Sequence, residues 1–138
     1  MMEAGRAIKV IDPYEWLPGH GENRINLRKQ NRTLLVDVEY DGEKGVMTKI
    51  FNFTDVCAFC VEAVPGPVLS NLTYSVKSPF PIGSLVEYPD SEAAVAWMQH
   101  YGDGRIVKHY SIVFLAENLL LVVFAGDVSL KVNPSQVY

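Results

Sequence analysis

The chain has 138 residues, of which 49% are apolar and 20% are charged, and its formal net charge is −4. These values are typical of a soluble globular protein, and the length predicts one domain over residues 1–138. The sequence has no apolar run of about 18 residues and no apolar segment behind N-terminal basic residues, so we expect neither a membrane span nor a signal peptide, and a cytoplasmic location.

The first 32 residues show no sustained hydrophobic period, and we predict an irregular N-terminal arm over residues 1–32 that wraps the domain. Trp16, flanked by Tyr14 and Leu17, is the expected anchor of this arm. The arm holds six basic and four acidic side chains, whereas the rest of the chain holds six basic and twelve acidic ones. An acidic body argues against a nucleic-acid binder, which usually presents a basic face.

Residues 33–64 are predicted to form a hairpin followed by a third strand. Apolar and polar side chains alternate from Leu34 to Tyr40 and again from Val46 to Phe53, and the intervening loop contains two glycines. Residues 55–64 fit either a strand or a short capped helix. We favour a strand, because this segment is short and rich in Val, Phe and Cys.

The next segment, residues 65–90, is predicted to be rich in loops, with one short strand over 84–88. A helix is predicted over residues 91–101, with Asp90 as its cap and Trp97 on the face that docks on the domain. The pair of glycines that follows Tyr101 is typical of a helix end.

The C-terminal hairpin, residues 106–132, carries the strongest signal. Leu119 to Ala125 is apolar throughout and contains β-branched and aromatic residues, which indicates a strand buried on both faces. Gly126 is expected to mark a bulge or bend before the half-exposed strand that ends at Val132.

These elements amount to about seven strands and one helix. Consecutive hairpins imply antiparallel pairing. We therefore predict a mainly β fold, with α+β at the margin: an antiparallel, strongly bent sheet, open barrel or sandwich of about seven strands with one short helix packed on it.

Cys57 and Cys60 form the only motif-like spacing in the chain. A redox C-x-x-C motif places its first thiol at a helix N-terminus, and a strand here would point the two thiols to opposite faces. A zinc site would need two more ligands, and no second such motif exists. We expect two free thiols that pack as small apolar residues, with no bound metal and no cofactor.

Catalytic signatures are also missing from the sequence. His109 is a candidate general base, but no nucleophile motif accompanies it, and we interpret it as a partly buried structural imidazole. Asp37 and Glu39 share one strand face, which suits a solvated face better than a pair of catalytic carboxylates. We therefore predict no catalytic residue.

The candidate binding residues are the one basic cluster: Arg24, Arg28, Lys29 and Arg32. A solvated arm is the plainer interpretation of this cluster. The alternative is an electrostatic contact with an acidic protein partner, which would raise the association rate more than the affinity.

The last third of the chain, a helix followed by KHYSIVF, a tight turn and an apolar return strand, resembles small bacterial proteins, some of which are immunity proteins against toxins. No defined motif assigns the chain to a family. Because the sequence shows no nucleophile, metal or phosphate-binding signature, we predict a non-enzymatic, small soluble binding module, for which an immunity-like protein-binding protein is one form, with no nucleic-acid or membrane partner. Two alternatives stay open. One is a small-molecule pocket or weak enzyme in a bent sheet, lined by aromatic residues, and the other is a homo-oligomeric structural subunit such as a homodimer.

Overall fold

The computed structural model describes residues 2–63, 72–74 and 83–133. The elements in chain order are β1 (Met2–Gly5), β2 (Ile8–Ile11), the 3-10 helix η1 (Pro13–Glu15), β3 (Arg24–Gln30), β4 (Thr33–Gly42), β5 (Gly45–Thr54), β6 (Ala58–Ala63), β7 (Leu72–Tyr74), β8 (Leu85–Glu87), α1 (Glu92–Tyr101), β9 (Lys108–Phe114), β10 (Leu119–Ala125) and β11 (Asp127–Val132). The fold is mainly β with one α-helix among these residues, which confirms the predicted class.

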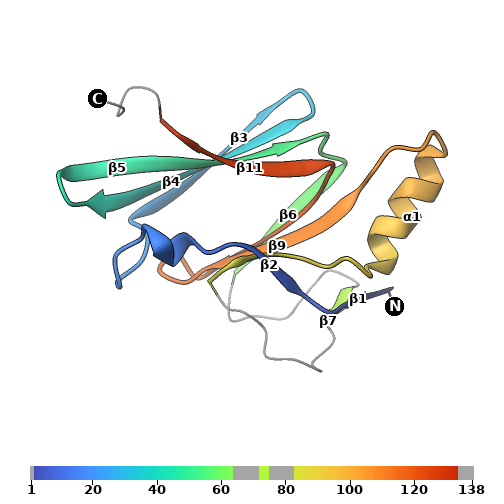
Figure 1. Cartoon of the computed structure of the whole chain (residues 1–138), viewed down its shortest axis with the longest axis horizontal. Helices are drawn as coiled ribbons and strands as arrows, with labels where there is room; N and C mark the ends of the chain where they lie inside the picture. The colour runs from blue at the N-terminus through green and yellow to red at the C-terminus, as the bar shows by residue number, and fades with distance from the viewer. Residues whose placement is uncertain (1, 64–71, 75–82, 134–138) are drawn as a thin grey trace.

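The strands form two antiparallel sheets (Figure 1). One has the order β2-β8-β9-β10-β6 and the other has the order β11-β5-β4-β3, while β1 and β7 make a separate parallel pair. The two predicted hairpins are both present, as β4 with β5 and as β9 with β10. Residues 55–64, for which a helix was the alternative, contribute strand β6.

Two bent strands join the sheets. Phe124 pairs with Ala58 in the five-stranded sheet, and three residues later Asp127 pairs with Thr54 in the four-stranded sheet. At this corner a Cβ on Gly126 would lie 3.1 Å from the Cβ of Asp55, so the two segments approach closely where the bend was predicted, and a larger residue would fit only if Asp55 shifted by a few tenths of an ångström. β5 and β6 can be counted as one bent strand, and β10 and β11 as another. Counted in this way, the two sheets form one strongly bent ladder of seven strands.

The main core lies between the two sheets. The β4 side chains alternate between buried and half-buried positions, and the buried set faces the inner side chains of β5, β9 and β10. The fully buried members of this core include Leu34, Val36, Val38, Phe51, Phe53, Tyr110, Ile112, Leu121 and Val123. Trp16 packs against this core with its ring centroid 4.9 Å from that of Tyr40, as expected of the anchor.

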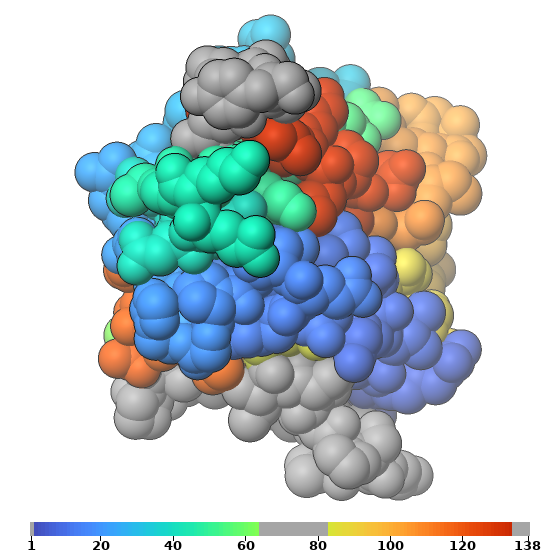
Figure 2. Space-filling view, turned by 60° about the vertical axis from the view of Figure 1, so that its left-hand side comes forward, coloured from blue at the N-terminus to red at the C-terminus, as the bar shows by residue number. Residues whose placement is uncertain are grey.

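The prediction of an irregular arm over residues 1–32 was wrong. Three strands occur there, and β3 pairs with β4 over its whole length from Arg24 to Gln30. Only Ile25 and Leu27 of β3 pack against the core, so the apolar alternation of this edge strand is too short to stand out between its charged residues. Figure 2 shows the N-terminal segment, in blue, on the surface below the β4–β5 hairpin.

Helix α1 covers the other face of the five-stranded sheet. Its N-cap is Ser91, one residue after the predicted Asp90, and Gly102 ends it in the left-handed conformation at φ 66°. Trp97 packs beside Ala93 on a cluster from β9 and β10 but stays partly exposed, so the docking face is as predicted and the burial is incomplete.

Much of the loop-rich segment predicted over residues 65–90 lies outside the described residues, including its proline-rich parts. Within it the structure places β7 and β8, and β8 falls in the predicted strand 84–88. No helix in the described ranges is both long enough and apolar enough to cross a membrane.

Candidate functional site

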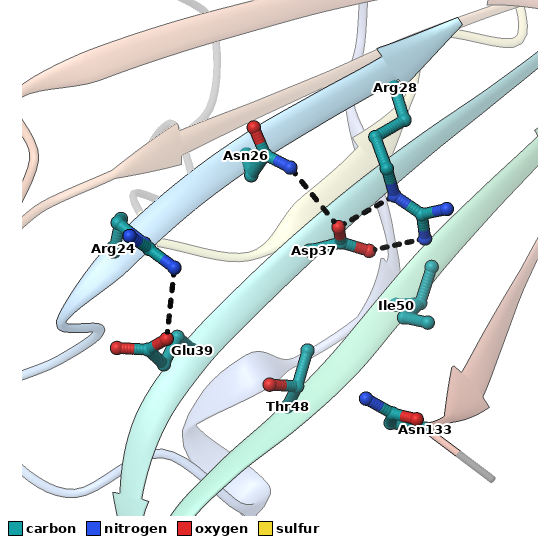
Figure 3. A pocket seen from close by; sticks show the side chains of 8 residues that line it. All are labelled: Arg24, Asn26, Arg28, Asp37, Glu39, Thr48, Ile50 and Asn133. Carbon is teal, nitrogen blue, oxygen red and sulfur yellow. Dashed lines mark hydrogen bonds and ion pairs between the residues drawn. The ribbon is translucent and has the colours of Figure 1, made fainter. Parts of the chain in front are cut away.

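A polar groove of about 510 Å³ lies on the outer face of the four-stranded sheet, opposite the core (Figure 3). We call it the outer groove, and its lining residues are Arg24, Asn26, Arg28, Asp37, Glu39, Thr48, Ile50 and Asn133. The two-residue alternation of side chains along a strand explains why this lining is polar. The residues of β4 that alternate with its buried positions point away from the core. Three neighbouring strands therefore bring polar side chains to one surface.

The best-ordered contact in the outer groove joins Arg28 to Asp37. Nε and Nη2 of Arg28 each donate to the carboxylate of Asp37 at 2.7 Å, in the two-point geometry that suits guanidinium and carboxylate groups. Asn26 donates to the same carboxylate at 3.4 Å. The hydrogen bonds from Arg28 hold the pKa of Asp37 below its ordinary value, although partial burial opposes them. Asp37 is thus an ionised, positioned acceptor.

Arg24 and Glu39 form a looser pair at the other end of the groove. They lie directly opposite each other on β3 and β4, and Nη2 of Arg24 donates to Glu39 at 3.3 Å. The Arg24 side chain is 73% exposed. An exposed pair of this kind contributes only about 0–1 kcal/mol, so Arg24 is free to exchange Glu39 for another acceptor at little cost.

The structure divides the predicted basic cluster in two. Arg24 and Arg28 point into the outer groove, whereas Lys29 lies on the opposite face of β3 and Arg32 in the turn after it. Arg32 pairs with Asp55 at 3.4 Å, at the corner between the sheets. The four residues therefore do not make one continuous basic surface.

Sequence reasoning placed Asp37 and Glu39 on one solvated face but missed the residues that surround them. Thr48, Ile50 and Asn133 join the groove through the pairing of β4 with β5 and of β5 with β11. The alternation of side chains along β5 could have placed Thr48 and Ile50 on the outer face of the sheet. Asn133 follows the strand that crosses between the sheets, and its position depends on that crossing.

His109 lies in the interior and not at a surface. Its side chain and that of Ser91 are fully buried, and Ser91 Oγ lies 2.8 Å from His109 Nδ1. Burial lowers the pKa of His109 to about 4. A serine beside a histidine can act as a nucleophile only where substrate reaches it, so this pair fits a structural role.

The two cysteines are free thiols at the sheet face beneath α1. Burial, with a smaller contribution from Glu62, raises the pKa of Cys60, which disfavours the reactive thiolate. Within residues 2–63, 72–74 and 83–133 the structure contains no group of three or more His, Cys, Asp and Glu side chains suited to hold a metal.

A second hollow, of about 590 Å³, lies beside Trp16 and the β4–β5 turn. It is slightly larger than the outer groove, but its charged side chains come from η1 and the turn and not from neighbouring strands of the sheet face. The outer groove has three strands and a fixed ion pair beneath it, so it is the stronger candidate. No family model, curated protein or solved structure compared with this chain matches it, and the candidate site rests on geometry alone.

Proposed function

We propose that this chain is a non-enzymatic binding module that contacts a protein partner through the outer groove. The observation that carries this proposal is the convergence of Arg24, Arg28, Asp37 and Glu39 on one open sheet face. Positioned donors and acceptors of both charges suit a polar protein surface, because complementary charge fixes the register of two partners.

The ion pairs change the role expected of the basic residues. Arg24, Arg28 and Arg32 each contact a carboxylate of this chain, so little uncompensated positive charge is left for long-range attraction. These arginines instead orient the bound partner and distinguish it from other proteins through contacts at short range. The partner must offer hydrogen-bonding groups that replace Glu39 at Arg24 or extend the Arg28–Asp37 pair.

A small apolar ligand fits the outer groove less well. Small-molecule sites are usually enclosed and lined by apolar and aromatic side chains, whereas Ile50 is the only large apolar side chain among the described residues that line this groove. Neutralisation of a toxin, as in immunity proteins, is one activity that such a protein-binding face would support.

The test compares two charge-matched double variants within the same segment. Arg24→Gln with Arg28→Gln removes the cations of the outer groove, and Lys29→Gln with Arg32→Gln removes the two that lie outside it. The wild-type protein is used to capture a partner from native lysate, and that partner is then purified. Association and dissociation rates are measured for each variant at two salt concentrations.

The groove variant should bind the captured partner at least tenfold more weakly, mainly through faster dissociation, while the control variant stays within twofold of the wild type. Melting curves of both variants separate lost binding from lost folding, because the groove variant removes the ion-pair partners of Glu39 and Asp37 and the control variant removes that of Asp55. Equal affinities for the two variants would contradict the assignment of the groove.

A further inference from the structure

Strand β3 is an open edge of the four-stranded sheet (Figure 1). It pairs with β4 over seven consecutive residues without a shift in register, and among the described residues β4 is its only ladder partner. The other edges differ from it. The ladder of β2 is irregular, β6 is followed directly by residues outside the described ranges, and β11 is separated from such residues by Asn133 alone.

The side chains of this edge determine what it can pair with. Residues 24–30 contain three cations and no carboxylate. An edge strand presents unpaired N–H and C=O groups that another strand can bond, and charged side chains normally limit this. Pairing of two β3 strands from two copies of the chain would place cations against cations, which is unfavourable. The edge therefore disfavours a second copy. Because Arg24 and Arg28 already pair with Glu39 and Asp37 of β4, their remaining N–H donors, and not an excess of free positive charge, favour an acidic segment.

The contacts with β4 show how such a segment would be held. Asp37 uses Nε and Nη2 of Arg28, and Glu39 uses Nη2 of Arg24. A guanidinium has five N–H donors, so each arginine keeps donors for a second carboxylate. A strand added on the free side of β3 would bring its own side chains beside these arginines at the cross-strand distance that β4 already uses.

We propose that β3 accepts an extended acidic segment of the protein partner as an additional strand of the sheet. This inference rests on the proposed function and specifies its partner: main-chain hydrogen bonds to β3 supply affinity, and carboxylates facing Arg24 and Arg28 supply specificity. The outer groove would then continue across the added strand.

The experiment uses the full-length protein labelled with ¹⁵N and three synthetic eight-residue peptides. The first alternates Glu and Val, the second alternates Lys and Val, and the third is the Glu–Val peptide with a central Val replaced by Pro. Alternate amides of a strand point to opposite edges, so one set of β3 amides is bonded to β4 and the other set is open. Amide hydrogen exchange and intermolecular NOEs report which set each peptide covers.

The Glu–Val peptide should slow exchange of the open set at least tenfold and give NOEs to β3 main-chain protons. The Lys–Val and Pro-containing peptides should leave exchange within twofold of the free protein. Equal protection by the Lys–Val peptide, or no protection by the Glu–Val peptide, would overturn the inference. If the Glu–Val peptide shifts the Asn26 side-chain amide and is weakened by Arg24→Gln with Arg28→Gln, yet leaves the open amides unprotected, the edge inference fails while groove binding stands.

Discussion

Ser91 Oγ and His109 Nδ1, 2.8 Å apart in the interior, join the start of α1 to strand β9. Ser91 Oγ also accepts the N–H of Ala94 at 3.1 Å, and its second lone pair and its own hydrogen allow either Ser91 Oγ or His109 Nδ1 to be the donor in their contact. The rings of Tyr88 and Phe124 each lie 4.5 Å from the imidazole, centroid to centroid. His109 Nε2 is buried and has no hydrogen-bond partner among the described residues, so a protonated ring would leave an N–H of a buried cation unpaired. The interior at the start of α1 therefore favours a neutral histidine.

This arrangement predicts a loss of stability in mild acid. Burial lowers the pKa of His109 from 6.5 to about 4, so the folded state binds fewer protons than the unfolded state between these values. Stability must then fall as the pH falls from 6.5 to 4, by about 3 kcal/mol in total for this group. Urea unfolding at a series of pH values measures the change.

His109→Phe is the control, since it keeps a ring between Tyr88 and Phe124 but cannot be protonated. The free energy of unfolding of the wild type should approach or fall below that of this variant as the pH decreases. Parallel curves for the two proteins between pH 6.5 and pH 4 would show that His109 does not carry the effect.

The sequence predicted the elements better than their arrangement. The alternation of β4 and β5 and the apolar run of β10 follow directly from strand geometry, and Gly126 marked the bend. What the sequence did not reveal is that β10 and β11 belong to different sheets. At that crossing Gly126 closely approaches Asp55, and such a contact between distant segments leaves no local pattern.

The candidate site shows the same limit. Arg24 and Arg28 were identified by charge, and Asp37 and Glu39 by their shared face. Their pairing follows from the register of β3 against β4, which depends on recognising β3 as a strand. His109 was expected to be partly buried, and its full burial depends on α1, Tyr88 and Phe124 closing around it.

The cysteines should have no chemical role. Cys57→Ala with Cys60→Ala is expected to leave the fold and the metal content unchanged, with a loss of about 1–2 kcal/mol from reduced packing beneath α1. Circular dichroism, thermal melting and elemental analysis of the purified proteins test this. Stoichiometric zinc in the wild type that is lost in the double variant would refute it.

Val123 should be essential to folding. It is 1% exposed and lies on β10 between the two sheets, where Val123→Asp would bury an unpaired charge at a cost of several kcal/mol. Val46→Asp is the matched control, because Val46 is also a strand valine but is 56% exposed. We expect Val123→Asp to unfold the domain and Val46→Asp to change stability by about 0.5 kcal/mol or less. Similar melting of the two variants would show that this part of β10 is not core.

Glu22 should hold the turn between β9 and β10. Its side chain is buried, and Oε2 accepts the N–H of Glu117 at 3.1 Å. Glu22→Ala removes this acceptor and should cost about 1–3 kcal/mol, whereas Glu22→Gln keeps an acceptor oxygen and should cost less. Urea unfolding of both variants at pH 7 gives the two values.

The two variants also separate the charge of Glu22 from its hydrogen bond. Burial raises the pKa of Glu22 above 4.5, although hydrogen bonds from backbone N–H groups partly oppose this. A raised pKa in the folded state means that the protonated carboxyl is favoured by folding, so this contribution is present below pH 4.5 and is lost as the pH rises through the folded-state pKa. The free energy of unfolding of Glu22→Gln minus that of the wild type should therefore be more positive at pH 7 than at pH 4. A difference between the two proteins that does not change with pH would contradict a raised pKa of Glu22 in the folded state.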